Sequence, residues 1–222
     1  MTSSLASELR TSIERWALQL RDTSALSALV QKQQLTPRAL AFYLESLRHL
    51  FQNSERHLPL ALQKAEQLGD ETLAAHFRRK IEEEDGHDLW ALEDLAKLPS
   101  TVTTGQRPAE AVTELLALQR QLIAQHPIYF AVYILWAEYF TVLLGDDWLA
   151  ALESCGFPRS GVSAISKHLA ADREHTRRSF EEIDSLWRGA PSADSLLRSI
   201  ERAGQLFEAF CDEICAEARR AA

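Results

Sequence analysis

The sequence predicts an all-α protein, a compact bundle of about seven or eight helices in a single domain spanning residues 1–222. Apolar residues recur with the 3.6-residue period of an amphipathic helix in almost every segment. No segment sustains the alternation of apolar and polar residues that is typical of a half-buried strand. A chain of 222 residues is long enough for one domain with a sizeable core.

The first third of the chain is predicted to form an amphipathic helix, a short helical segment over residues 24–31 and a longer helix. Ser3 or Ser4 is expected to cap the first helix, because serine side chains accept hydrogen bonds from the free N–H groups of a first turn. Thr36 followed by Pro37 marks the start of the longer helix. Pro59 is expected to break or kink this helix, whose pattern resumes as far as residue 69.

The middle of the chain is predicted to contain one long helix, capped by Asp70 and ending at about residue 97. Gly86 lies inside this helix, where glycine costs about 1 kcal/mol relative to alanine, so it indicates close packing or a local distortion. Residues 99–108 are rich in Thr, Ser and Gly and are expected to form a loop. Pro108 is expected to open a helix that ends at about residue 124.

The remaining helices are bounded by turn residues. A very apolar helix follows Pro127, and Gly145 and then residues 156–160 are expected to end it. Ser160 is expected to cap the next helix. After a turn at residues 188–192, Ser192 is expected to cap an amphipathic terminal helix.

The composition argues against several classes of protein. A net charge of −8 without a concentrated basic face disfavours a nucleic-acid partner. The N-terminal residues lack the basic and apolar regions of a signal peptide. Residues 128–145 are long enough to suggest a membrane span, but they carry Glu138 among aromatics, which favours the core helix of a soluble protein. Three cysteines without metal-type spacing indicate the reducing cytoplasm.

Three potential metal ligands, His168, Asp172 and His175, recur at intervals of four and three residues in one predicted helix. This spacing places them along one stripe of the helix, so that their side chains can converge. Ile165 and Leu169 lie near the same stripe, whereas most of the charged residues fall elsewhere, which indicates that the stripe faces inward. A surface position on a polar helix is the alternative interpretation.

A second acidic and histidine cluster occurs in the predicted helix over residues 70–97. Glu84 stands three residues before His87, the Glu-x-x-His spacing that occurs in di-metal carboxylate bundles. Glu84 is the preferred ligand, and Glu83 is the alternative.

Glu138 is the only charged residue between Pro127 and Gly145. An isolated buried carboxylate is costly, so Glu138 is expected to have a metal, a cation or hydrogen-bond donors as its partner. Together the three segments supply six donors of mixed nitrogen and oxygen type, which suits two transition-metal ions. These candidate ligands are Glu84, His87, Glu138, His168, Asp172 and His175.

The runs that carry these donors resemble the haem-oxygenase-like di-iron oxidases and oxygenases. They are Lys-His-Leu-Ala-Ala-Asp-Arg-Glu-His, ending at His175, and Glu-Glu-Asp-Gly-His-Asp-Leu-Trp around His87, with the apolar helix of Glu138 between them. The resemblance extends over about residues 36–187. It implies a seven-helix haem-oxygenase-type fold and a non-haem centre of two iron ions that activates O2.

Carried over by position, the resemblance implies that the six candidate donors hold the irons, that Glu138 bridges them, and that Glu138 and His168 are catalytic. It also implies a small organic substrate of amino-acid or fatty-acid type, in a reaction of natural-product biosynthesis. An external electron donor and a homodimer are compatible with it. One departure stands out: many members carry a glutamate seven residues before the first histidine, where this chain has Lys80. Glu84 is then expected to substitute for it.

Two other functions remain open. The same architecture hosts cofactor-independent enzymes similar to thiaminase II and pyrroloquinoline-quinone synthase, and the former type needs a nucleophilic cysteine in the cavity. The second open function is that of a non-enzymatic helical interaction protein with buried ion pairs. True haem oxygenase activity is disfavoured, because no histidine precedes His49 and no glycine lies between Pro127 and Leu144.

Overall fold

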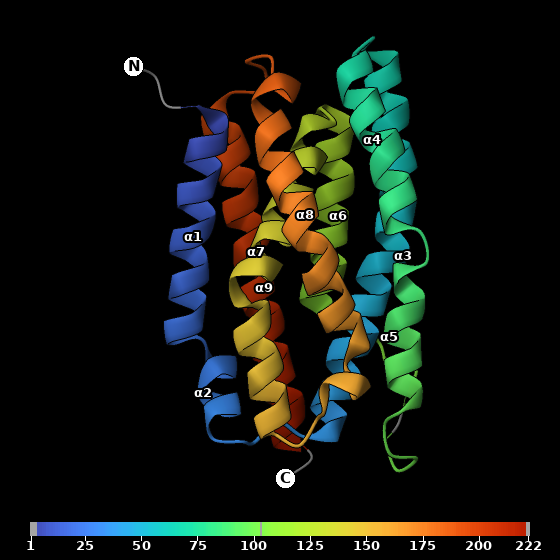
Figure 1. Cartoon of the computed structure of the whole chain (residues 1–222), viewed down its shortest axis with the longest axis vertical. Coiled ribbons are helices and arrows are strands. Elements are labelled where there is room, and N and C mark those ends of the chain that lie inside the picture. Colours follow the sequence, from blue (N-terminus) through green and yellow to red (C-terminus); the bar gives the residue numbers. More distant parts are fainter. Residues whose placement is uncertain (1–3, 103, 221–222) are drawn as a thin grey trace.

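Helix α7 (Ile128–Ser154) forms the centre of the bundle (Figure 1). In the computed structural model, which describes residues 4–102 and 104–220, α7 packs against α1, α2, α6, α8 and α9. By length and composition α7 could cross a membrane, the single such helix among the described residues, but 67% of its most apolar stretch is buried inside the protein. It therefore has the position of a core helix, as the sequence predicted.

The described residues contain α-helices, one short 3₁₀ turn (η1) and no strand. In Figure 1, α1 and α2 lie at one side of the bundle and α3, α4 and α5 at the other, with α7, α8 and α9 between them. The elements in chain order are α1 (Leu5–Thr23), α2 (Ala25–Gln31), α3 (Pro37–Gln67), α4 (Glu71–Glu84), α5 (His87–Ala96), α6 (Glu110–Gln125), α7, η1 (Arg159–Gly161), α8 (Ser163–Leu186) and α9 (Ala193–Arg220).

Short polar side chains cap the first four helices. Ser4 caps α1, and Ser3 lies outside the described residues. Ser24, Thr36 and Asp70 each accept a hydrogen bond from a backbone N–H in the first turn of α2, α3 and α4 respectively. The predicted starts of these helices are thus confirmed, because the capping interaction is local in sequence.

The continuity of three predicted helices differs from the structure. The expected long helix over residues 70–97 is wrong: α4 ends at Glu84 and α5 begins at His87, because Gly86 adopts a left-handed conformation with φ of 75°. Pro59 lies inside α3, which runs unbroken from Pro37 to Gln67. Helix α7 passes through Gly145, which is a point of close approach: an added Cβ would lie 2.9 Å from Leu169 on α8.

Two helices are capped by residues that are distant in sequence. The carboxylate of Glu213 on α9 accepts hydrogen bonds from the backbone nitrogens of Glu110 and Ala111, so α6 begins two residues after Pro108. The carboxylate of Asp94 on α5 accepts a hydrogen bond from the nitrogen of Ala164 at the start of α8. The predicted Ser160 cap is therefore wrong, and Asp94 takes that role.

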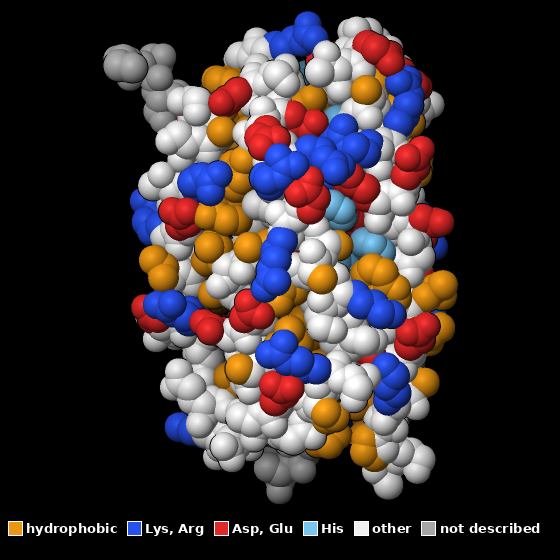
Figure 2. Space-filling view, viewed as in Figure 1, with side chains coloured by type: hydrophobic (Ala, Val, Ile, Leu, Met, Phe, Trp, Pro, Cys, Tyr) orange, Lys and Arg blue, Asp and Glu red, His pale blue; other side chains and the backbone are white. Residues whose placement is uncertain are grey.

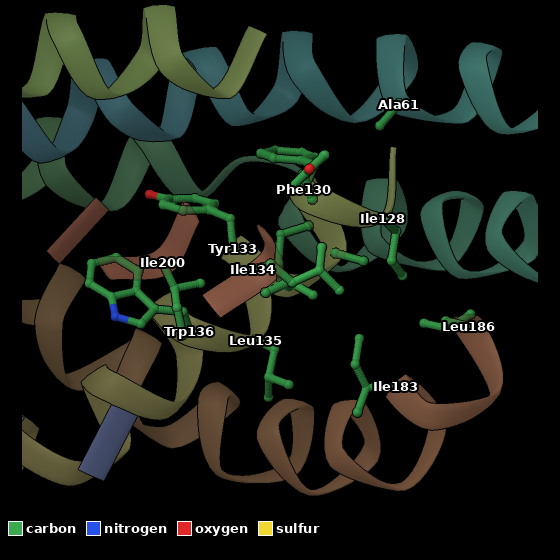
Figure 3. Close-up of a cluster of buried hydrophobic side chains, with 14 of the residues drawn as sticks. Ala61, Ile128, Phe130, Tyr133, Ile134, Leu135, Trp136, Ile183, Leu186 and Ile200 are labelled. Carbon is green, nitrogen blue, oxygen red and sulfur yellow. The ribbon is translucent and has the colours of Figure 1, made fainter. Parts of the chain in front are cut away.

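The hydrophobic core surrounds the N-terminal half of α7. Figure 3 shows Tyr133, Ile134 and Trp136 of this helix among side chains of α8 and α9, with Ala61 of α3 nearby. Burial of these side chains supplies the main free energy of folding. It also holds Glu138, one turn beyond Ile134, inside the bundle.

Candidate metal centre

His168 presents an unused nitrogen inside the protein. Its Nδ1 lies 2.8 Å from the carbonyl oxygen of Ala164, which can only accept, so Nδ1 carries the proton. Burial, together with nearby His87, lowers the pKa of His168, which is therefore neutral. Its Nε2 is buried and has no hydrogen-bond partner among residues 4–102 and 104–220. A neutral imidazole that is oriented through Nδ1 and bare at Nε2 is a typical metal ligand.

Glu84, His87 and His168 bring one ligand atom each within 4.8 Å of one another, and we call these residues the first donor group. Glu84 ends α4 and His87 begins α5, and the left-handed Gly86 between the helices turns both toward α8. The Glu84 carboxylate lies 3.0 Å from His87 Nδ1. Burial opposes the ionisation of Glu84, but the two histidines and this contact hold its pKa below the ordinary value.

Aromatic side chains fix the two imidazole rings of the first donor group. Trp90 stacks on His87 with 4.2 Å between ring centroids. Phe51 of α3 stacks on His168 at 4.3 Å. The two histidine rings meet edge to face, with 4.5 Å between their centroids. The donors are thus held in place before any ligand binds, which lowers the cost of binding.

Glu83, Glu138 and His175 form a second donor group, again with ligand atoms within 4.8 Å of one another. Asp172 adjoins this group, because its Oδ1 lies 3.8 Å from His175 Nδ1. The Asp172 carboxylate raises the pKa of His175 above its ordinary value. Both groups draw on α4 and α8, whereas α7 contributes Glu138 to the second and α5 contributes His87 to the first.

The side chain of Lys80 fills the second donor group. Lys80 is 1% exposed, and its ammonium lies 2.5 Å from Glu138 Oε1 and 2.7 Å from Glu83 Oε2. The remaining oxygens are also engaged: Ser179 donates to Glu138 Oε2, and Arg178 donates to Glu83 Oε1. Burial disfavours the charged ammonium, but the two carboxylates outweigh it and raise the pKa of Lys80.

Glu138 titrates near neutrality. Burial raises its pKa to about 7, and the charges of Asp172 and Glu84 act in the same direction, while Lys80 opposes them. A carboxylate in this range is able to take up or release a proton at physiological pH.

A cavity of about 750 Å³ opens beside the first donor group. Glu84 and His168 line it, together with Glu138 and Asp172, whereas His87, Glu83 and His175 do not. Its wall is otherwise mainly apolar, with side chains such as Leu47, Leu50, Phe130, Ile134, Phe140, Leu144, Ile165, Leu206, Phe207 and Ile214. The volume is in the range of sites for small organic ligands.

The side of the two donor groups that faces away from the cavity reaches the protein surface. Figure 2 shows histidine side chains among acidic and basic ones in the seam between α8 and the α4–α5 segment. The side chain of His175 is 14% exposed there. The two donor groups thus approach solvent on one side, at His175, and line the cavity on the other, through Glu84, His168 and Glu138.

The two donor groups differ in how well they fit a metal ion. The first offers an ionised carboxylate and two imidazoles, of which His168 Nε2 has no other partner in the described part of the chain, and this set suits iron. In the second, the carboxylate oxygens that an ion would need already bind an ammonium and a guanidinium. The first donor group fits one ion, and the second, as arranged, does not fit another.

The predicted site residues gather as follows. The structure brings Glu84, His87 and His168 together, and it places Glu138 and His175 in the second group with Asp172 beside them. Glu84 and Glu83 were alternatives in the sequence, and each belongs to one group. Sequence reasoning noted Lys80 as a departure but missed its contact with Glu138. The apolar period of the long helix over residues 70–97, which places Lys80 on its buried side, was the signal available.

Solved structures share the fold of this chain, although no protein-family description and no curated protein matches its sequence. One is a domain of unknown function with a haem oxygenase-like fold from Shewanella denitrificans OS217: 18% identity, a TM-score of 0.83, and coverage of 96% of this chain and 92% of that one. Two others are crystal structures of a CADD-like protein of unknown function from Nostoc punctiforme PCC 73102. One of them has 15% identity and a TM-score of 0.71, and the match covers 95% of this chain and 98% of that one. The other has 13% identity and a TM-score of 0.59, and the match covers 96% of this chain and 97% of that one.

These likenesses confirm the predicted fold. The chain has the haem oxygenase-like, all-α fold. Counting α4 and α5 as the two halves of one predicted helix, it also has the predicted number of helices. Function has to be argued from the site itself, because one fold hosts many activities.

Proposed function

We propose that this chain is a non-haem iron oxidase or oxygenase that uses O2 to oxidise a small organic substrate with an aliphatic chain. The observation that carries the proposal is His168, a neutral imidazole whose buried Nε2 has no partner in the described residues and which lies beside Glu84 and His87 at the cavity wall. Buried His57 and His76 also have an Nε2 without a hydrogen-bond partner in the described residues, but of these three histidines only His168 belongs to a group of metal donors there.

The residues of the first donor group would hold the iron. Glu84 would supply charge, and His87 and His168 would supply nitrogen donors whose rings are held by Trp90 and Phe51. Bound Fe(II) supplies an open coordination position and electrons for O2, and an external donor restores them. Glu138, with a pKa of about 7 and a place in the cavity wall, is positioned to exchange a proton with bound substrate.

The cavity favours the fatty-acid type of substrate over the amino-acid type. Apart from the donor residues, the charged side chains that line it are Arg21, Asp22 and Asp147. Arg21 and Asp22 pair with each other and are largely exposed, so they do not form a buried site for an ammonium and a carboxylate. Binding of an aliphatic chain against the mainly apolar wall is instead favourable, because it removes methylene groups from water.

The test is an anaerobic Fe(II) titration of the purified protein, followed by mixing with O2 in a stopped-flow spectrophotometer. We expect iron uptake and a transient visible absorption band, both lost in His168→Ala. Glu138→Ala is expected to lose the band. His49→Ala is the matched control, because His49 on α3 belongs to neither donor group. Absence of iron uptake by the folded wild type would refute the proposal.

Cofactor-free chemistry of the thiaminase type is the alternative, and Cys211 is the residue to consider because it lines the cavity. Burial raises the pKa of the Cys211 thiol, with Cys215 and acidic neighbours acting in the same direction. A thiol with a raised pKa is a poor nucleophile. Turnover that survives chelation of iron but disappears in Cys211→Ser would favour this alternative.

A further inference from the structure

We infer that the ammonium of Lys80 takes the place of a second metal ion, so that the centre holds one ion per chain. This inference rests on the proposed binding of iron by the first donor group. Lys80 extends from α4 into the interior and reaches Glu138 on α7. The ammonium therefore lies between the two carboxylates of the second donor group.

The ammonium uses the oxygens that a second ion would require. A metal–carboxylate bond is about 2.0–2.2 Å long, so an ion bound to Glu138 Oε1 or Glu83 Oε2 would have to displace Lys80 from contacts of 2.5 and 2.7 Å. Displacement would leave a buried ammonium without its partners, which is strongly unfavourable. Lys80 is 1% exposed and has no short path to solvent for its charge.

Charge balance leads to the same result. Glu83 and Glu138 contribute two negative charges, and Lys80 and Arg178 offset them with two positive charges at distances of 2.5–2.7 Å. A divalent ion added to this group would create an excess of positive charge inside the protein. In the first donor group the Glu84 carboxylate forms an ion pair only with His87 among the described residues, so it can still accept a metal cation.

The two groups also differ in free ligand atoms. In the first, His168 Nε2 is buried without a hydrogen-bond partner in residues 4–102 and 104–220, and His168 lines the cavity. In the second, both oxygens of Glu138 and both oxygens of Glu83 have a donor or cation at 3.1 Å or less. In the second group His175 Nδ1 is also buried without a hydrogen-bond partner in the described residues, so that group has a free nitrogen but no free carboxylate oxygen for an ion.

The test is the number of metal ions bound per chain, measured by elemental analysis after anaerobic loading with Fe(II) or Mn(II) and desalting. We expect one ion in the wild type and two in Lys80→Glu, which removes the ammonium and adds a ligand. Lys80→Met removes the charge at nearly constant volume, and it is expected to show a second binding event by calorimetry. Lys32→Glu, at an exposed position, is the control for charge reversal and is expected to bind one ion.

Two ions bound by the wild type would overturn the inference on Lys80 while leaving the proposed function intact. No ion bound by the folded wild type would overturn both. One ion in both Lys80 variants, with circular dichroism showing that they are folded, would show that Lys80 is not what excludes the second ion. If Lys80→Glu does not fold, the number of ions bound by the wild type and by Lys80→Met still tests the inference.

Discussion

Asp94 and Ala164 are joined by a hydrogen bond of 2.6 Å between the Asp94 carboxylate on α5 and the Ala164 nitrogen that opens α8. The carbonyl oxygen of the same Ala164 accepts the Nδ1 proton of His168 at 2.8 Å. Ala164 thus connects the buried carboxylate of Asp94 to the ring orientation of the candidate ligand His168. The start of α8 and the tautomer of His168 both depend on a side chain from α5.

Asp94→Ala is expected to lower the free energy of unfolding by about 1–3 kcal/mol, because it removes a helix cap and leaves the Ala164 nitrogen unsatisfied. It is also expected to weaken iron binding, since Ala164 in the first turn of α8 orients His168. Urea unfolding and calorimetric titration with Fe(II) measure the two effects. The control is Asp146→Ala, which removes an exposed ion pair with Arg173 and is expected to change the free energy of unfolding by less than about 0.5 kcal/mol. Equal losses in the two variants would contradict the capping role.

Gly86→Ala is expected to lower the free energy of unfolding by about 1–2 kcal/mol, because a left-handed residue with a Cβ is strained. The substitution disturbs the left-handed turn between α4 and α5, which is expected to move His87 relative to Glu84 and to weaken metal binding. Gly69→Ala is a matched control: Gly69 has φ of 67° and open space around an added Cβ, but it lies at the end of α3. Both variants should lose stability in urea, and only Gly86→Ala should lose affinity for Fe(II). Unchanged affinity in Gly86→Ala would mean that the left-handed turn does not set the donor geometry.

Sequence reasoning succeeded where an interaction is local and failed where it is long-range. The spacing of His168, Asp172 and His175 predicted one stripe on α8, because helical periodicity depends only on neighbouring residues. The caps at Ser24 and Thr36 were predictable for the same reason.

The role of Asp94 as a cap and the contact of Lys80 with Glu138 join helices that are far apart in the chain. The apolar period could place Lys80 on the buried side of its helix, but it could not identify Glu138 as the partner, and the role of Asp94 leaves no periodic signal. Gly86 was recognised as unusual, but a glycine in a helical pattern does not tell whether the backbone turns left-handed or the helix continues. The structure was needed to divide the six predicted donors between two groups.

Gly204→Ala is expected to destabilise the protein although alanine is the better helix former. An added Cβ would lie 2.6 Å from Cε2 of Trp16, so α1 and α9 would have to move apart or the Trp16 ring would have to rotate. Overpacking of this kind costs about 1–3 kcal/mol, which exceeds the gain of about 1 kcal/mol in helix propensity. Gly161→Ala, where the nearest atoms are 4.0 Å away, is the control and is expected to be nearly neutral. Thermal unfolding compares the two, and a stabilised Gly204→Ala would contradict the close packing.

His57 is expected to make the stability of the protein depend on pH. It is 1% exposed, its Nδ1 lies 2.9 Å from Gln119 Oε1, and burial together with Arg120 and Arg56 lowers its pKa. The unfolded state, with an ordinary pKa of about 6.5, binds a proton before the folded state does. Stability is therefore fully present above about pH 6.5 and is lost as the pH falls below it, at up to about 1.4 kcal/mol per pH unit.

The double substitution His57→Leu with Gln119→Leu removes the titrating group together with its hydrogen-bond partner, so neither side chain of this pair is left without the other. Urea unfolding between about pH 7.5 and 5.5 is expected to show a smaller loss of stability in the double variant than in the wild type. The other histidines with lowered pKa values are unchanged and serve as the internal reference. Equal losses of stability in the wild type and the double variant would show that His57 does not contribute to the pH dependence.

Ala151→Phe is expected to shorten the cavity at the end remote from the donor groups. Ala151 lines the cavity and stands 13 residues after Glu138 on α7, which corresponds to roughly 20 Å along the helix. If the cavity holds an aliphatic chain that extends from the donor groups, a phenyl ring at this position excludes only the longer chains.

Calorimetric titration of the iron-loaded protein with saturated fatty acids of increasing length measures this effect. The affinity of Ala151→Phe is expected to fall for the longest acids that bind the wild type and to stay unchanged for short ones. Ala170→Phe makes the same substitution at an exposed position of α8 and should leave every affinity unchanged. A uniform loss across all lengths would indicate a disturbed fold, and no loss at any length would mean that substrate does not extend along α7.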